Sequence, residues 1–223
     1  MKNISIAIDG PAGSGKSTIA KLISKEYGII YLDTGAMYRT FALFALRNKA
    51  DLSNRGELEA LLDSFNIEVK YINEEQRVLL NGEDVSSLIR TNEISTGASA
   101  VGLVPAVRIK MVEIQRKIAL GTSVVMDGRE IGTYVLPNAE IKIFLVATPD
   151  VRARRRYLEL VERGDNSLSE EEIKQDIIKR DKNDMEREFA PLKQAEDAIL
   201  LDTSEMSIEE VCSEVRQIVD KFI

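Results

Sequence analysis

The chain has 223 residues, of which 44% are hydrophobic and 30% charged, and its formal net charge is −7 at pH 7. This balance is typical of one globular domain, and the negative charge argues against a nucleic-acid duplex as the main partner. No apolar run approaches the length of a membrane span, and Asp9-Gly10-Pro11 ends the first apolar run before it could form a signal peptide. We therefore expect a cytoplasmic protein that binds neither membranes nor nucleic acids.

The chain opens with a predicted strand and a glycine-rich loop. Residues 4–9 (ISIAID) are apolar and β-rich, which predicts a buried parallel strand. Residues 10–17 (GPAGSGKS) match the phosphate-binding pattern of two glycines with four residues between them, followed by Lys and Ser. Apolar side chains then return at helical spacing, at Ile19, Ile23 and Tyr27. This order of strand, loop and helix favours a site for a nucleoside triphosphate.

The composition of residues 10–17, which we name the phosphate loop, has a physical reason. Glycines permit positive φ, so that successive N–H groups converge on phosphate oxygens at the positive end of the next helix. Lys16 is expected to reach the β- and γ-phosphates, and the Ser17 hydroxyl to bind Mg²⁺. The residues expected to bind the triphosphate are Gly10, Pro11, Ala12, Gly13, Ser14, Gly15, Lys16, Ser17 and Thr18.

The next part of the chain contains a change of pattern. Residues 29–33 predict a second strand and residues 35–48 a helix. Residues 65–90 contain the strand-like stretches FNIEVKYI and RVLL, and the pair Asn81-Gly82 is a strong turn signal. We therefore expect a small antiparallel insertion there.

The rest of the chain alternates between helices and strands. Helical periodicity covers residues 94–120, where Pro105 is predicted to start a second helix. A charged helical stretch follows over residues 150–187, broken at residues 164–166. Three further strands are predicted at residues 123–128, 141–147 and 198–202. This alternation predicts an α/β fold with a parallel sheet of at least five strands, which binds ligands at the carboxyl ends of the strands.

Candidate chemistry beyond the phosphate loop lies at a strand end and in an arginine run. Asp127 ends a predicted strand, where a carboxylate can hold Mg²⁺ together with Ser17. The run RARRR at residues 152–156 lies near the break in the long helical stretch. Arginines on a mobile flap, among them Arg155 and Arg156, can close over a triphosphate and neutralise the transferred charge.

The chain contains no histidine, which excludes histidine-based acid–base and nucleophilic schemes. Transfer between phosphates remains possible without such a base. A phosphate monoester has a second pKa of about 6, so that at neutral pH the acceptor is largely dianionic. Positioning, Mg²⁺ and arginines are then sufficient.

Several motifs together resemble one family. They are IDGPAGSGKST, LDTGAMYR, GEDVSSLIRT, DGREIGT, KIFLVA, the arginine run, KRDKNDMEREFAPL and LLDTSEMSIEEV. On these motifs, which extend over essentially the whole chain, the sequence resembles the bacterial cytidylate kinases among the nucleoside monophosphate kinases. The first motif is shared by many P-loop kinases, whereas the second, third and fourth together are much more specific.

The resemblance implies a single P-loop kinase domain, residues 1–223, with a five-stranded parallel sheet flanked by helices. Its expected parts are a core (1–34, 121–150 and 195–223), a nucleoside monophosphate lobe with an antiparallel β insertion (35–120) and an arginine-rich lid (about 151–190). The implied reaction transfers the γ-phosphate of ATP to CMP or dCMP, with Mg²⁺ as cofactor. We expect ATP and CMP or dCMP to be the binding partners of the protein, and we expect the protein to be a monomer.

The resemblance also assigns roles to residues. The catalytic set comprises Lys16, Asp127, Arg129, Arg155 and Arg156. The CMP-binding set comprises Thr34, Tyr38, Arg39, Ser99, Arg108, Arg129, Glu130, Arg180, Asp184 and Arg187. Within the second set the phosphate is assigned to Arg39, Arg129 and Arg187, and the sugar to Arg180 and Asp184. The base is assigned to Ser99, Arg108 and Glu130.

The assignment to the base agrees with its chemistry. Cytosine offers an amino donor and two acceptors, which a carboxylate and an arginine complement. Uracil places an acceptor opposite the carboxylate, so that we expect discrimination in favour of cytosine. Members of the family it resembles usually have Asp where this chain has Glu130, and Thr34 replaces the more usual Ser with retention of the hydroxyl.

Two alternatives stay open at this point. A kinase for another small acceptor is one, and an alcohol acceptor would need a carboxylate base, for which Asp33 is the candidate. A nucleotide-dependent switch or binding module without an acceptor is the other. Against the switch, DKND at residues 181–184 falls on a predicted helix rather than after a strand.

Overall fold

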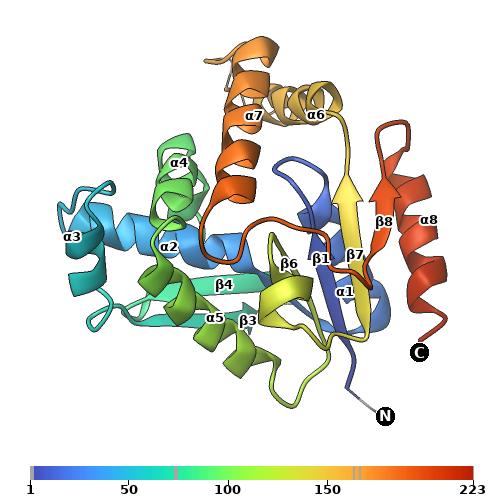
Figure 1. Ribbon diagram of the computed structural model, residues 1–223, viewed down its shortest axis with the longest axis horizontal. Coiled ribbons are helices and arrows are strands. Elements are labelled where there is room, and N and C mark those ends of the chain that lie inside the picture. Colours follow the sequence, from blue (N-terminus) through green and yellow to red (C-terminus); the bar gives the residue numbers. More distant parts are fainter. Residues whose placement is uncertain (1–2, 73–74, 163, 166, 223) are drawn as a thin grey trace. The chain divides into compact units, whose positions relative to one another are not determined.

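The computed structural model describes residues 3–72, 75–162, 164–165 and 167–222. The chain divides into two compact units, the first comprising Met1–Ile30 with Ser123–Ile223 and the second Tyr31–Thr122. In chain order the elements (Figure 1) are β1 (Ser5–Asp9), α1 (Lys16–Tyr27), β2 (Ile30–Asp33), α2 (Thr34–Arg47), α3 (Arg55–Ala60), β3 (Ile67–Ile72), β4 (Glu75–Leu80), β5 (Glu83–Asp84), η1 (Leu88–Arg90), α4 (Asn92–Val101), α5 (Pro105–Ala119), β6 (Val124–Gly128), η2 (Ile131–Val135), β7 (Ile141–Val146), α6 (Pro149–Glu162), α7 (Glu170–Glu186), β8 (Ile199–Asp202) and α8 (Ile208–Val219).

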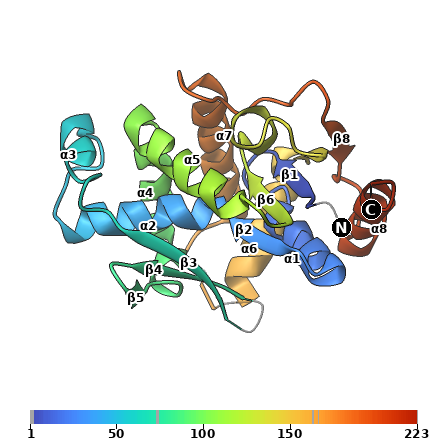
Figure 2. The same cartoon turned by 90° about the horizontal axis from the view of Figure 1, so that it is seen from below.

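Five strands form one sheet in the order β2-β6-β1-β7-β8, which confirms the predicted parallel sheet. The strand β1 pairs in parallel with β6 and β7, and β7 pairs in parallel with β8. The side chains of Ile6, Ala7 and Ile8 are fully buried because β1 lies in the middle of the sheet. Helix α1 packs on β1, β6 and α8 (Figure 2). The phosphate loop therefore begins at the carboxyl end of a central strand.

The second unit contains the predicted antiparallel insertion. Its three strands lie in the order β3-β4-β5, and both pairings are antiparallel (Figure 2). Asn81 and Gly82 join β4 to β5 with φ values of 50° and 88°, as a tight hairpin turn requires. Residues 73–74, between β3 and β4, lie outside the described residues. An aromatic cluster supports this unit, since the rings of Phe41 and Phe65 meet edge to face at 5.0 Å.

Short elements such as α3 and η2 were not predicted. Helix α3 has only six residues and begins with the cap Asn54, whose side chain accepts hydrogen bonds from two backbone N–H groups. The segment η2 is a single π-helical turn, in which the N–H groups of Tyr134 and Val135 both donate to the carbonyl of Glu130. Both are too short for hydrophobic periodicity to identify.

The predicted break in the charged helical stretch separates α6 from α7. Helix α6 ends at Glu162, and α7 begins after a capping box in which Ser169 and Glu172 each bind the other's backbone. Of the predicted break residues, Gly164 has φ 79°, whereas Asn166 lies outside the described residues. The two helices share a small apolar cluster, Ala153, Leu160, Ile173 and Ile177.

The first glycine of the phosphate loop is constrained by the neighbouring strand. Gly10 has φ 149°, and a Cβ atom at this position would overlap the carbonyl oxygen of Leu145 in β7. Backbone atoms of a central strand cannot move aside cheaply. The close approach therefore requires glycine.

We expect Gly10→Ala to lower the free energy of unfolding by about 3 kcal/mol, because the new methyl group meets backbone. Gly28→Ala is the control, since Gly28 has φ 63° but nothing within 4 Å of an added Cβ; it is expected to cost about 1 kcal/mol. Urea unfolding of both variants measures the difference. Equal losses of unfolding free energy in the two variants would show that the positive φ alone, and not the contact with β7, requires glycine at position 10.

Candidate functional site

The phosphate loop ends in an exposed set of backbone donors. Gly13 and Gly15 have φ 73° and 90°, and α1 begins directly afterwards at Lys16. Gly15 is the N-cap and supplies no side-chain hydrogen bond to the first turn. The free N–H groups and the positive end of α1 therefore form a site suited to an anion.

The Lys16 side chain is folded back into the phosphate loop. It is only 5% exposed, and its Nζ donates to the carbonyl of Pro11 at 2.6 Å and to Ser14 Oγ at 3.3 Å. Burial, and next the guanidinium of Arg129, lower the pKa of Lys16 to about 7, although Asp127 acts in the opposite direction. Phosphate oxygens beside this amine would restore its positive charge.

Ser17 and Asp127 meet as the sequence predicted. The Ser17 hydroxyl donates to Asp127 Oδ2 at 2.7 Å. Asp127 is buried near the end of β6, where its register partner on β1 is Ile8. A hydroxyl and a carboxylate thus lie together beside the first turn of α1, in the arrangement that triphosphate-binding proteins use for Mg²⁺.

Four residues predicted to bind CMP form one chain of ion pairs within the first unit. Arg129 Nε donates to Asp184 Oδ2 at 2.7 Å, and Asp184 Oδ1 accepts from Arg187 Nη1 at 3.1 Å. Arg187 Nη2 donates to Glu130 Oε2 at 2.9 Å, and both of these side chains are 5% exposed. Arg187 Nε also donates to the carbonyl of Ala190. Two predicted phosphate ligands are therefore held in place by carboxylates.

The predicted lid arginines make contacts on three different segments. Arg155 donates to the hydroxyl and carbonyl oxygens of Thr203, on the loop after β8, at 3.1 and 2.6 Å. Arg156 pairs with Glu159 one turn along α6. Arg180 pairs with Asp176 on α7. These positions do not test the predicted catalytic and sugar-binding roles, which stay predictions.

Helix α2 places the first acceptor candidates of the second unit. Asp33 is its N-cap and accepts from Ala36 N–H at 2.8 Å, while its other oxygen accepts from Arg39 Nη2 at 2.8 Å. Thr34 is buried at the first position of the helix. The Asp33 carboxylate is thus engaged in capping and ion pairing, which disfavours its suggested role as a base.

Arg108 and Tyr38 form the second group of this unit. Arg108, on α5, is buried, its Nη1 donates to the carbonyl of Gly102 at 3.1 Å, and its guanidinium carbon lies 5.3 Å from the centre of the Tyr38 ring. Stacking of this kind fixes the plane of the guanidinium group. Ser99, which is also assigned to the base, lies on α4, which precedes α5 in the chain.

Asp9 is a buried carboxylate of the first unit that was not among the predicted site residues. Asp9 accepts hydrogen bonds from the N–H groups of Ile131 and Gly132, both at 2.7 Å. It therefore fixes the start of η2, directly after Arg129 and Glu130. Burial raises the pKa of Asp9 to about 6, against the effect of the two backbone hydrogen bonds. An acidic residue at the end of an apolar strand was the only available signal.

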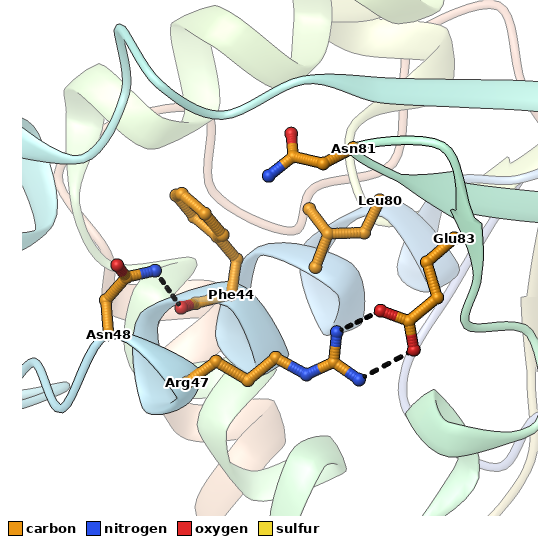
Figure 3. Close-up of a pocket in the computed structure, with 6 residues that line it drawn as sticks. All are labelled: Phe44, Arg47, Asn48, Leu80, Asn81 and Glu83. Atoms are coloured by element: carbon orange, nitrogen blue, oxygen red, sulfur yellow. Dashed lines mark hydrogen bonds and ion pairs between the residues drawn. The ribbon is translucent and has the colours of Figure 1, made fainter.

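A surface hollow of the second unit lies between α2 and the antiparallel insertion. It has a volume of about 350 Å³, and its lining includes Phe44, Leu80 and Asn81 (Figure 3). Arg47 spans it with a bidentate ion pair to Glu83, at 2.6 and 2.9 Å. None of the residues predicted to bind substrate lines this hollow, and it is best explained as a gap beside a structural ion pair.

Comparison with known proteins identifies the family. The family model described as cytidylate kinase matches residues 6–221. The chain belongs to the cytidylate kinase family. The cytidylate kinase of Caldicellulosiruptor bescii is 48% identical over 223 residues, covering 100% of this chain and 98% of that protein. That of Geobacillus sp. (strain WCH70) is 51% identical over 221 residues, covering 99% and 98%.

Solved structures agree on the fold of this family member. A crystal structure of an uncharacterised protein from Eubacterium ventriosum ATCC 27560 matches with a TM-score of 0.54 at 16% identity, covering 98% of this chain and 99% of that one. The shikimate kinase of Bacteroides thetaiotaomicron matches with a TM-score of 0.50 at 15% identity, covering 97% and 98%. Among the described residues, no helix combines the length and apolar composition needed to cross a bilayer.

The alternative of a guanine-reading switch is weakened by the same structure. The DKND segment lies within α7, where Asp181 and Asp184 pair with Arg152 and Arg129. A base-reading segment of the switch type was expected after a strand. In this member of the cytidylate kinase family, the segment is instead part of α7, and its two aspartates bind arginines of other elements of the first unit.

Replacement of Asp9 is expected to change the pH dependence of stability. Because the folded protein holds the Asp9 proton up to about pH 6 and the unfolded chain only to about 3.8, the contribution of Asp9 to stability falls as the pH rises between these values. The free energy of unfolding of wild type minus that of Asp9→Asn should therefore decrease by about 2 kcal/mol from pH 4 to pH 6. Denaturant unfolding across this range measures it, and a constant difference would contradict the assignment.

Proposed function

We propose that the protein transfers the γ-phosphate of ATP to CMP or dCMP, giving ADP and CDP or dCDP. The observation that carries the proposal is the meeting of the phosphate loop, Lys16, Ser17 and Asp127 at the start of α1 in a chain of the cytidylate kinase family. This arrangement supplies amide donors, one amine and one metal-binding pair. Those are the groups that phosphoryl transfer requires for positioning and charge stabilisation.

The donor side follows from the loop. The N–H groups at the start of α1 bind the phosphate oxygens of ATP, and Lys16 leaves its contacts with Pro11 and Ser14 to reach the β- and γ-phosphates. The lid arginines Arg155 and Arg156 close over the triphosphate and exclude water. Water exclusion favours transfer to the acceptor over hydrolysis of ATP.

The residues present fit Mg²⁺. The described residues contain no cluster of three or more His, Cys, Asp or Glu side chains placed to hold a metal. Mg²⁺ needs no such cluster, because it keeps several waters and binds one or two protein oxygens together with substrate phosphates. Ser17 and Asp127 would hold the ion, which neutralises charge on the phosphates when bound.

The acceptor needs no protein base. Its phosphate is largely ionised at neutral pH, since the second pKa of a phosphate monoester is about 6. We assign this phosphate to Arg39, Arg129 and Arg187, which orient an oxygen toward the γ-phosphorus. The sugar is assigned to Arg180 and Asp184.

Recognition of cytosine is assigned to Ser99, Arg108 and Glu130, together with Thr34 and Tyr38. Arg108 donates to the acceptor atoms of cytosine while Tyr38 supports its guanidinium plane. The carboxylate of Glu130 accepts from the amino group. Uracil would leave these groups mismatched, so that CMP is preferred to UMP.

The wider setting is proposed from composition and family. We infer a cytoplasmic monomer whose partners are its nucleotides and which binds no nucleic acid. The net charge of −7 supports the last point, because the positive charge is confined to local clusters.

The reaction is tested by measuring ADP release from ATP and Mg²⁺ with CMP, dCMP, UMP or AMP as acceptor. We expect rapid turnover with CMP or dCMP, and a loss of about 100-fold or more in kcat for Lys16→Ala with an unchanged circular dichroism spectrum. Preferred turnover of UMP or AMP would reject the cytosine assignment. ADP release that no acceptor stimulates would favour a nucleotide-dependent switch.

Arg108→Ala is expected to raise the KM for CMP about 10- to 100-fold and to leave the KM for ATP within about twofold, because Arg108 is assigned to the base alone. Arg116→Ala is the matched control, since Arg116 lies on the same helix with an exposed side chain. Steady-state kinetics with each nucleotide varied in turn gives both constants. Equal increases for both nucleotides would mean that Arg108 has another role.

A further inference from the structure

One residue of the phosphate loop, Ala12, is held at both its backbone N–H and its carbonyl by side chains of α6 and α7. Asp181 Oδ1, on α7, accepts from the N–H of Ala12 at 3.1 Å. Arg152 Nη1, on α6, donates to the carbonyl of Ala12 at 2.8 Å and to Asp181 Oδ2 at 2.6 Å. We name these two side chains the Ala12 clamp.

The Ala12 clamp is closed off from solvent. Arg152 is 4% exposed and Asp181 5%. Arg152 Nε donates in addition to the carbonyl of Ala147 at 2.8 Å, at the end of β7. A buried ion pair with this many hydrogen bonds holds its geometry closely, since any displacement leaves a charge unpaired in a low dielectric.

The phosphate loop also packs directly against both helices. A Cβ atom on Gly13 would lie 3.3 Å from Arg152 Cβ and 3.7 Å from Ile177 Cδ1. Gly13 itself has φ 73°. The conformation of the phosphate loop, and with it the direction of its N–H groups, therefore depends on the positions of α6 and α7.

Helix α7 connects this contact to the acceptor residues. Asp181 lies between Arg180 and Asp184, which are assigned to the sugar of CMP, and Asp184 pairs with Arg129. Residues three apart on a helix lie on neighbouring positions of its surface. One turn of α7 thus carries both a ligand of the phosphate loop and a ligand assigned to the acceptor.

We propose that Arg152 and Asp181 are positioning residues that set the orientation of the two peptide groups flanking the Ala12 Cα, and through them the affinity for the triphosphate of ATP. They act on the donor without belonging to the phosphate-binding pattern. Because Asp181 shares its helical turn with Asp184, occupation of the acceptor site and the geometry of the phosphate loop are coupled. This second step rests on the proposed function, whereas the first does not.

The variants for the test are Asp181→Asn, Arg152→Lys and the double variant. Asn keeps the shape of Asp181 but places an uncharged amide against Arg152. Lys keeps the charge of Arg152 but cannot reach Ala12, Asp181 and Ala147 together. Glu170→Gln is the matched control, because it breaks the Arg154–Glu170 ion pair between the same two helices away from the phosphate loop.

We expect each single variant to raise the Kd for ATP, measured by calorimetry without CMP, about tenfold. The double variant should be little worse than either single one, because the two residues bind each other and hold the backbone of the same residue. Amide hydrogen exchange at Ala12 should be faster in Asp181→Asn. Glu170→Gln should leave the Kd within about twofold.

Kinetics separates this role from a merely structural one. In folded variants, assayed well below their unfolding temperatures, the KM for ATP should rise more than the KM for CMP measured at saturating ATP. An unchanged Kd for ATP, or additive effects of the two changes, would overturn the positioning role. If wild type binds ATP but lacks CMP-dependent turnover, the proposed function fails, and the calorimetric comparison still decides the Ala12 clamp.

Discussion

The structure depends on holding the phosphate loop in the conformation that brings its backbone N–H groups to the start of α1, where the helix has no side-chain cap. Such a loop has no side-chain cap and no ladder partners, and it has to be held from outside. The carbonyl oxygen of Leu145 in β7 leaves no room for a side chain at Gly10. Lys16 Nζ donates to the carbonyl of Pro11, and Arg152 and Asp181 bind the backbone of Ala12. The strand order, with β1 between β6 and β7, places each of these supports beside the loop.

Charge is arranged in the same local manner. The chain as a whole is acidic, yet Arg129, Arg152 and Arg187 pair with carboxylates in buried or half-buried positions. This pairing keeps guanidinium groups in fixed orientations at little cost in repulsion. An acidic protein can in this way hold several cations close together in fixed orientations.

Sequence patterns predicted the elements whose signals are local. The strand, loop and helix at the start, the turn at Asn81-Gly82 and the five-stranded sheet are all confirmed, because periodicity and glycine placement lie within short windows. The meeting of Ser17 with Asp127 also followed, since both were expected at the same end of the sheet.

What the sequence did not reveal were long-range supports. Asp9 binds backbone more than 120 residues away, and Asp181 binds Ala12 at a separation of 169 residues. Backbone N–H groups carry no residue identity, so that no pattern in the sequence marks them as partners. Arg152 was predicted to belong to a mobile arginine flap, because no sequence pattern marks the carbonyl of Ala12 as its partner. The structure instead buries Arg152.

The ion-pair chain Arg129–Asp184–Arg187–Glu130 has a consequence for how the proposed acceptor site would respond to ionic strength. Two guanidinium groups and two carboxylates sum to zero, so that an arriving phosphate exchanges one anion for another. Few counterions are released in such an exchange. Affinity governed by replacement of internal carboxylates varies with salt far less than affinity governed by open arginines.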